Sequence, residues 1–393
     1  MTLEDRIPEL LQRPIVSLRR DETLDAVLAR LEASRAEVLA RDWVTAFWRL
    51  HLAKNGFSKS IALLEELRPD LDAAVVHRLT LGTFTACGRI EEELAYLSAR
   101  PDPTPQEQWE YLRAAAKAGR LEVLDQALDR PDPSVLAPNL EELADLLWAL
   151  GDWRRYRALS TVFSEDYPRK AFFEAALADI EAAPEVEPLT IHVLYLERER
   201  HRLAAQERSF AGSVHRRELF PGLDGRLVPT CVLTRGHWER GRFAIACSHL
   251  RLWEHLVESG DEGRFVGETD SVLTHRSRLR AEDFRAFDFV TFNDRVFPPG
   301  WGETFAPAGR IDDFVPAQGQ AGFDGYYLSR RMAEHLLGLY TARGVRRHID
   351  IQTFSMFRDG LLPPGFRTGR TDWPLVRHFS LGVSARRAAG LGD

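Results

Sequence analysis

Cysteine pairs, long apolar runs and an excess of basic residues are all absent from this chain of 393 residues. Its three cysteines, Cys87, Cys231 and Cys247, lie far apart, so the sequence has neither the C-x-x-C spacing of a zinc site nor a disulfide framework. No apolar run approaches the ~20 residues of a membrane span. The formal net charge of −7 argues against a nucleic-acid backbone as the main partner. These absences favour a globular protein of a reducing compartment.

The amino-terminal segment carries Glu4, Asp5 and Glu9, where a signal peptide needs a basic region followed by an apolar one. We therefore expect a cytoplasmic protein. An apolar content of 44% and a charged content of 28% are typical of soluble globular proteins. The length predicts two domains.

Residues 1–183 are rich in Leu, Ala, Glu and Arg and have helical periodicity. Four glycines, Gly56, Gly88, Gly119 and Gly151, recur at spacings of 32, 31 and 32 residues between amphipathic stretches. A tight turn between helices often needs a positive φ, which glycine adopts readily. The period and the helix-turn-helix unit resemble tetratricopeptide (TPR)-type repeats, so we expect an N-terminal α-helical solenoid.

Such solenoids present a concave surface to peptides or proteins, so partner recognition is one role for residues 1–183. Support of the second domain, or formation of a dimer, is the other, and the sequence favours neither. The aromatic side chains of this half are expected to pack between helices rather than to contact ligands. They include Trp43, Phe47, Trp48, Trp109, Trp148 and Trp153.

After Pro188 the sequence becomes β-branched and apolar in short runs that alternate with amphipathic stretches. This alternation predicts an α/β domain over residues 189–393. The expected strands are 189–196, 217–220, 265–267, 287–292 and 325–328, and the expected helices are 197–210, 241–259 and 329–340.

Glu268, Thr269 and Asp270 follow the predicted strand 265–267. Side chains alternate along a strand, so we expect Glu268 and Asp270 to project to the same side. Two carboxylates at the carboxyl end of a strand suit a divalent cation that bridges to a diphosphate. The alternative is an acidic turn that binds nothing.

The predicted helix 241–259 carries a motif that resembles a known family. Residues Gly241 to Glu254 are similar to the G-x-x-G-C-x-x-S-H-L-x-x-W helix of glycosyltransferase family 25, which includes bacterial lipooligosaccharide galactosyltransferases and animal collagen galactosyltransferases. The resemblance covers residues 189–355, and other pieces occur in the same order. They are 196–202 (N-L-D-R-R-x-D-R), 220–225 (F-x-A-x-D-G), 265–272 (L-V-L-E-D-D-V), 326–334 (A-Y-L-I-S-R-x-G-A-E) and a late Asp at Asp350.

The resemblance implies a GT-A-type α/β domain that binds a nucleotide sugar, commonly UDP-galactose, and transfers the hexose with inversion, usually with Mn²⁺. Glu268 and Asp270 stand where the metal ligands are expected, for Mn²⁺ or Mg²⁺. Inversion needs a base that removes the acceptor's proton. Asp350 is the leading candidate, followed by Asp324 and Asp294, although each could instead be a helix cap or turn residue.

Six more residues are expected at the donor site. Arg198 and Arg202 suit phosphates, because a guanidinium donates bidentate hydrogen bonds to phosphate oxygens. A solvated helix face would explain these arginines too, and a buried structural histidine would explain His249. The matching motif positions add Asp224, Ser248, His249 and Thr269.

The expected function is therefore that of an enzyme, a glycosyltransferase whose helical repeats recruit a protein, peptide or glycan acceptor. Thr269 replaces one carboxylate of the family's E-D-D, and Tyr195 replaces the opening Asn. The alternative is a catalytically inactive glycosyltransferase-like module in a binding or assembly protein. A phosphate-ester hydrolase is less favoured, because the sequence offers no Cys/His or Ser/His nucleophile arrangement.

Overall fold

The computed structural model describes residues 7–9, 12, 15–18, 21–40, 43–160, 169–182, 187–211, 213–227, 240–274, 279–298 and 309–378. Secondary structure changes from helices to strands between α13 (Lys170–Ala182) and β1 (Thr190–Tyr195). Packing divides the described residues into two compact units, one that ends at Ala114 and one that begins at Ala115. The helices that directly precede the sheet in sequence therefore belong to the same unit as the sheet.

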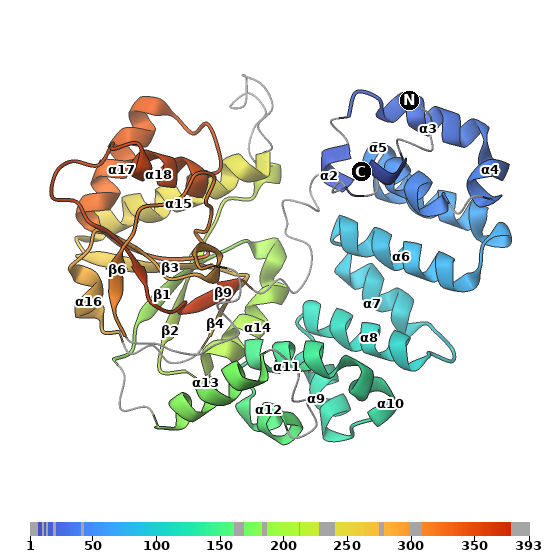
Figure 1. Cartoon of the computed structure of the whole chain (residues 1–393), viewed down its shortest axis with the longest axis horizontal. Helices are drawn as coiled ribbons and strands as arrows, with labels where there is room; N and C mark the ends of the chain where they lie inside the picture. The colour runs from blue at the N-terminus through green and yellow to red at the C-terminus, as the bar shows by residue number, and fades with distance from the viewer. Residues whose placement is uncertain are drawn as a thin grey trace. The chain divides into compact units, whose positions relative to one another are not determined.

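The first unit contains only helices among its described residues, as the sequence predicts (Figure 1). Leucines, Phe47 and Trp48 form its core. The Trp48 indole nitrogen donates to the Thr83 hydroxyl at 2.8 Å. The helices are α2 (Ile15–Leu18), α3 (Leu24–Ala33), α4 (Arg35–Ala40), α5 (Val44–Leu67), α6 (Ala73–Cys87), α7 (Ile90–Ser98) and the start of α8 (Pro105–Lys117).

The four repeating glycines lie in turns between helices with φ values of 78°, 66°, 75° and 67°. The turn at Gly56 divides α5 into two helical segments, and those at Gly88, Gly119 and Gly151 each follow one helix and precede the next. The prediction of helix turns that require positive φ is confirmed. The turns at Gly119 and Gly151 fall in the second unit.

The helical part of the second unit comprises α9 (Leu121–Asp129), α10 (Pro133–Leu136), α11 (Leu140–Ala149), α12 (Trp153–Ser160) and α13. Trp148 is fully buried. Its ring contacts those of Trp153, Tyr156 and Phe173 at centroid distances of 4.2, 5.6 and 4.6 Å. This confirms that Trp148 and Trp153 pack between helices.

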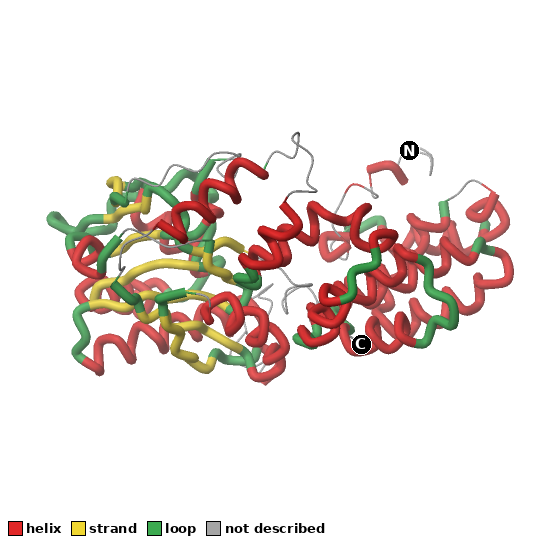
Figure 2. The backbone as a smooth tube through the Cα atoms, turned by 90° about the horizontal axis from the view of Figure 1, so that it is seen from below, coloured by secondary structure: helices red, strands yellow, loops and turns green. Residues whose placement is uncertain are grey.

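A seven-stranded mixed sheet forms the centre of the second unit, so the α/β class is confirmed (Figure 2). Strands β1, β2 and β3 are parallel, β7 is antiparallel to both β3 and β5, and β8 runs parallel to β5. The order across the sheet is β2 (Arg216–Pro221), β1, β3 (Gly263–Glu268), β7 (Gly325–Ser329), β5 (Phe289–Thr291), β8 (Thr368–Thr371) and β6 (Ile311–Asp313).

Helices cover both faces of this sheet. One face packs on α15 (Arg240–Ser259), α17 (Arg330–Arg343) and α18 (Ile349–Arg358), and the other packs on α14 (Arg200–Ala211) and α16 (Ala281–Arg285). Because β7 is antiparallel to its neighbours, its amino end meets the carboxyl ends of β1, β3 and β5 at one edge. The chain segments that leave this edge carry the candidate site.

A separate two-stranded ribbon joins β4 (Ser271–Leu273) to β9 (Val376–His378). The helices of the same unit brace it. The indole of Trp148 in α11 donates to the Thr274 carbonyl at 2.8 Å, and the ring of Trp373 stacks on Phe172 of α13 at 5.2 Å. The buried Arg377 lies 3.6 Å from Asp145 of α11.

Helix α14 also packs against these helices, at the glycine turns. A Cβ at Gly119 would lie 2.6 Å from the His201 carbonyl oxygen, and one at Gly151 would lie 3.4 Å from that of Ser209. Arg208 donates to Asp125 at 2.8 Å and to Asp152 at 3.1 Å. The turns at Gly119 and Gly151 thus form part of the surface on which α14 packs.

Two further sequence expectations concern membranes and cysteines. In the described parts of the chain, we find no helix with the length and apolar content that a membrane crossing needs. Cys87 and Cys247 form no disulfide bond among the described residues, and Cys231 lies outside them.

We expect Gly119→Ala to lower the free energy of unfolding by about 2 kcal/mol or more, because alanine at positive φ is strained and its Cβ meets a backbone carbonyl. The control is Gly338→Ala in α17, where the added methyl meets nothing within 4 Å. There we expect a gain of about 0.5–1 kcal/mol. Urea unfolding followed by circular dichroism measures the free energy of unfolding of both variants. Equal changes in the two variants would contradict the close packing of the Gly119 turn against α14.

Candidate functional site

Three carboxylates converge at the carboxyl end of β3. Glu268 is the last residue of that strand, Asp270 lies in the turn before β4, and Asp324 directly precedes β7. The strand ends at Glu268 and a turn carries Asp270, so strand alternation, from which we expected the two side chains to share a side, does not extend to Asp270. The turn nevertheless keeps the two carboxylates close enough that Asp270 helps to raise the pKa of Glu268.

Asp270, Asp324 and His378 form a group whose nearest ligand atoms all lie within 4.8 Å of one another. The ribbon supplies His378, which lies opposite Ser271 in the β4–β9 register. One oxygen of Asp270 (Oδ1) is buried and has no hydrogen-bond partner among the described residues. Two carboxylates and an imidazole are suitable ligands for a divalent ion such as Mn²⁺. The donor set of these three residues therefore suits a divalent metal, and it includes Asp270, one of the two ligands predicted from the sequence.

The acids affect each other's protonation strongly. Burial, aided by Asp270 and Asp350, raises the pKa of Glu268 to about 8. Burial, aided by Glu268 and Asp270, raises the pKa of Asp324 to about 8, against the opposing effect of Arg295. Without a bound cation, the folded site therefore retains protons near neutral pH.

A hydrogen-bonded chain from α15 orients Glu268. The indole of Trp253 donates to the Tyr326 hydroxyl at 2.9 Å, and that oxygen lies 2.9 Å from Nδ1 of His249. In the tautomer that carries its proton on Nε2, the tyrosine hydroxyl donates to Nδ1 and Nε2 of His249 donates to Glu268 at 3.2 Å. Burial lowers the pKa of His249 to about 4, so the ring is neutral near pH 7.

Asp324 is held from two sides. One Arg295 nitrogen donates to both of its oxygens at 2.9 and 3.0 Å. The amide of Asn293, at the end of β5, donates to the carbonyls of Gly322 and Gly325 at 2.7 and 3.1 Å. The loop that carries Asp324 is thereby tied to the neighbouring strand.

Two other predicted catalytic residues lie around this group. Both oxygens of Asp350, in the first turn of α18, accept backbone N–H groups, from Gly322 at 3.0 Å and from Ile351 at 2.7 Å. Asp350 also contributes to the raised pKa of Glu268, which places its charge near the cluster. Asp294 accepts the backbone N–H of His378 at 2.8 Å, so it positions the histidine.

Of the predicted donor-site residues, some lie at the acid cluster or form an ion pair, and Ser248 supports a loop. Arg202 is buried 3.9 Å from Asp270, at the cluster. Arg198 pairs with Asp224 at 3.3 Å, and Thr269 is buried in the turn between Glu268 and Asp270. Ser248 instead supports a loop, since its hydroxyl donates to the Ala244 carbonyl and accepts the Leu223 N–H at 2.8 Å.

The sequence did not single out His378, Arg295 or Tyr326. Tyr326 could have been predicted from the sequence, because it belongs to the 326–334 motif. Its hydroxyl is the shared hydrogen-bond partner of His249 and Trp253 in the 241–254 motif. His378 offers no local signal, since its place depends on pairing between β4 and β9. Arg295 becomes significant only through its contact with Asp324.

No protein-family model matches the chain, and no curated protein matches it significantly. The interpretation of the site therefore rests on its own geometry.

We expect Tyr326→Phe to lower the free energy of unfolding by about 1–3 kcal/mol, because it leaves the buried Trp253 indole and His249 Nδ1 without their partner. The matched control is Tyr327→Phe, whose hydroxyl makes no hydrogen bond with the described residues. Denaturant unfolding compares the two. A loss of similar size in both variants would contradict the chain of hydrogen bonds.

Stability of the metal-free protein should depend on pH. Glu268 and Asp324 have pKa values near 8 when folded, against about 4 when unfolded. The folded state then binds more protons, so stability falls as pH rises from about 5 to 9. His249, lowered to a pKa of about 4, acts in the opposite sense and costs stability as pH falls below about 6.5.

Thermal unfolding in a chelator, measured across this pH range, tests that expectation. Asp324→Asn should flatten the alkaline fall, because the amide does not titrate. An unchanged alkaline slope in the variant would contradict the role of Asp324.

Proposed function

We propose that this protein is a metal-dependent glycosyltransferase that transfers a hexose from a nucleotide sugar, with UDP-hexose the leading donor, to a protein, peptide or glycan acceptor with inversion. The observation that carries the proposal is the oxygen and nitrogen cluster of Asp270, Asp324 and His378, with its buried unpaired carboxylate oxygen. Its position at the carboxyl edge of an α/β sheet supports the same conclusion, since ligands bind there in open α/β folds.

The charge balance of the cluster supports a diphosphate substrate only together with a cation. Glu268, Asp270 and Asp324 would repel phosphates by themselves. A divalent ion held by Asp270, Asp324 and His378, with Glu268 reaching it through water, would neutralise the leaving diphosphate. Arg202, buried beside Asp270, adds a fixed positive charge at the same place.

Asp350 is our candidate for the general base. The two backbone N–H groups that it accepts fix its carboxylate at the amino end of α18. Asp324 is less suited to the role because Arg295 occupies both of its oxygens.

The sequence resemblance to glycosyltransferase family 25 agrees with this proposal. In the motif helix, His249 and Trp253 belong to the hydrogen-bonded chain that ends on Glu268, and Ser248 supports the loop at Asp224. The GT-A type of the α/β domain and the TPR type of the repeats belong to the proposal as well, with the repeats as the acceptor-recruiting part.

A catalytically inactive module is the second candidate. Thr269 stands where the resembled family has a carboxylate, and the Arg295 contact partly neutralises Asp324. Both features would weaken metal binding. Binding and transfer must therefore be measured separately.

Isothermal titration with UDP-, GDP-, ADP- and dTDP-sugars, with and without Mn²⁺, tests the donor site. We expect one sugar nucleotide to bind only with Mn²⁺, and Asp270→Asn to weaken that binding about tenfold or more through loss of a metal ligand. Asp312→Asn on the distant edge strand β6 is the matched control and should bind normally. Absence of binding to every donor would favour the inactive module.

Asp350→Asn separates binding from chemistry. We expect it to bind the donor like the unmodified chain and to transfer sugar about 10²–10⁴-fold more slowly, since it removes only the base. Transfer at an unchanged rate would remove Asp350 from the mechanism.

A further inference from the structure

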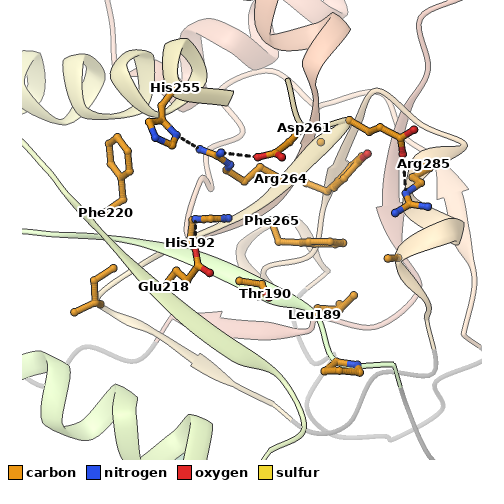
Figure 3. Close-up of a pocket in the computed structure, with 16 residues that line it drawn as sticks. Leu189, Thr190, His192, Glu218, Phe220, His255, Asp261, Arg264, Phe265 and Arg285 are labelled. Carbon is orange, nitrogen blue, oxygen red and sulfur yellow. Dashed lines mark hydrogen bonds and ion pairs between the residues drawn. The ribbon is translucent and has the colours of Figure 1, made fainter. Parts of the chain in front are cut away.

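A second polar pocket lies at the opposite end of β3 from the acid cluster (Figure 3). Its volume of about 660 Å³ is in the range of small-molecule sites. Thr190 and His192 of β1, Glu218 and Phe220 of β2, and Arg264 of β3 contribute to its lining. Arg264 and Glu268 are four residues apart on the strand, about 13 Å, so the two sites are distinct.

Arg264 is an almost fully buried cation in the wall of this pocket, with 4% of its surface exposed. One of its terminal nitrogens (Nη1) donates to His255 Nδ1 at 2.7 Å, and the other (Nη2) donates to Asp261 at 2.8 Å. Figure 3 shows the guanidinium above the ring of His192. Its Nε is buried and has no hydrogen-bond partner among the described residues. The fold therefore leaves this N–H group without a partner in the described part of the chain.

Tyr327 supplies a second available polar group. Its hydroxyl makes no hydrogen bond with the described residues, although the side chain lies in the pocket lining and the residue is 3% exposed. A Cβ at position 263 would lie 2.2 Å from this hydroxyl, so only glycine leaves room for it. The chain thus keeps space for a hydroxyl that has no partner among the described residues.

Carboxylates and guanidinium groups both line the pocket, and most of them pair with one another. Arg264 pairs with Asp261 at 2.8 Å, Arg285 with Glu262 at 3.2 Å, and His192 with Glu218 at 3.4 Å. Burial lowers the pKa of His192 to about 4, so its ring is neutral near pH 7. An anion would meet three carboxylates and a cation would meet two guanidinium groups. A neutral ligand avoids both repulsions.

Phe220 completes the site with an apolar surface. Its half-buried ring lies edge-on to His255, with centroids 5.7 Å apart. A pyranose ring combines an apolar C–H face with a rim of hydroxyl groups that both donate and accept. That combination matches an aromatic ring beside a guanidinium group with an unpartnered N–H, a phenol hydroxyl without a partner among the described residues, and exposed carboxylate oxygens.

We propose that this pocket binds a neutral saccharide, through stacking on Phe220 and hydrogen bonds to Arg264 and Tyr327. In the context of the proposed function, on which this role rests, the pocket holds a distal sugar of a glycan acceptor. The saccharide binding itself does not depend on that function.

Saturation-transfer NMR and calorimetric titration with lactose, maltotriose and chitotriose test the proposal on the full chain. We expect at least one of them to bind at millimolar concentration. Phe220→Ala and Tyr327→Phe should each weaken that binding about fivefold or more, through loss of stacking or of one hydrogen bond. The control is Arg216→Ala. Arg216 is exposed on β2, the strand of Phe220, and lies outside the pocket lining, so this variant should bind saccharide like the unmodified chain.

Inorganic phosphate serves as the anionic probe. The proposal is overturned if no saccharide binds, if phosphate binds in the pocket instead, or if binding survives in both pocket variants. UDP with Mn²⁺ is titrated into the same variants. Saccharide binding without UDP binding would contradict only the proposed transfer function. UDP binding without saccharide binding would contradict only the proposed saccharide site.

Discussion

The mutual repulsion of the carboxylates at the end of β3 is the constraint on which the site depends. Glu268, Asp270 and Asp324 are brought together in a partly dehydrated place, where like charges raise each other's pKa values. Arg295, Arg202 and His378 offset only part of that repulsion. The remainder favours uptake of protons or of a cation, which is the physical origin of the metal affinity that we infer.

Holding these acids together requires supports from every neighbouring element. The Trp253, Tyr326 and His249 chain fixes Glu268 from α15, and Asn293 fixes the loop of Asp324 from β5. The ribbon that brings His378 to Asp270 is supported by α11, through Trp148 and through the pair of Asp145 with Arg377, and by α13, through Phe172. Helices from the repeat half are therefore structural parts of the site, and partner recognition is better sought in the helices before Ala115.

Much of this architecture could be predicted from the sequence, because its signals are local. Positive-φ glycines at a regular period predicted the helix turns, and apolar β-branched runs predicted β1, β3, β5 and β7. The short strands β6 and β8 were missed, since Ile-Asp-Asp and Thr-Gly-Arg-Thr have no apolar alternation. At the site, Asp270 and His249 could be named from motif positions, and Asp324 was named as a candidate base. His378 could not, because only the pairing of two segments far apart in the chain places it there.

The proposed saccharide pocket and the acid cluster share one strand and one helix, and this relation limits what an acceptor can be. Arg264, Val266 and Glu268 alternate onto the face of β3 that packs on α15, and the fully buried Val266 separates the two polar ends. Helix α15 repeats the arrangement, with His249 at the cluster, His255 at the pocket and buried Leu252 and Trp253 between them. No ligand can pass through this packed layer. An acceptor that occupied both places would have to bypass this layer, over more than the ~13 Å between Arg264 and Glu268. A single sugar is too short for that path, whereas an oligosaccharide of several units is long enough.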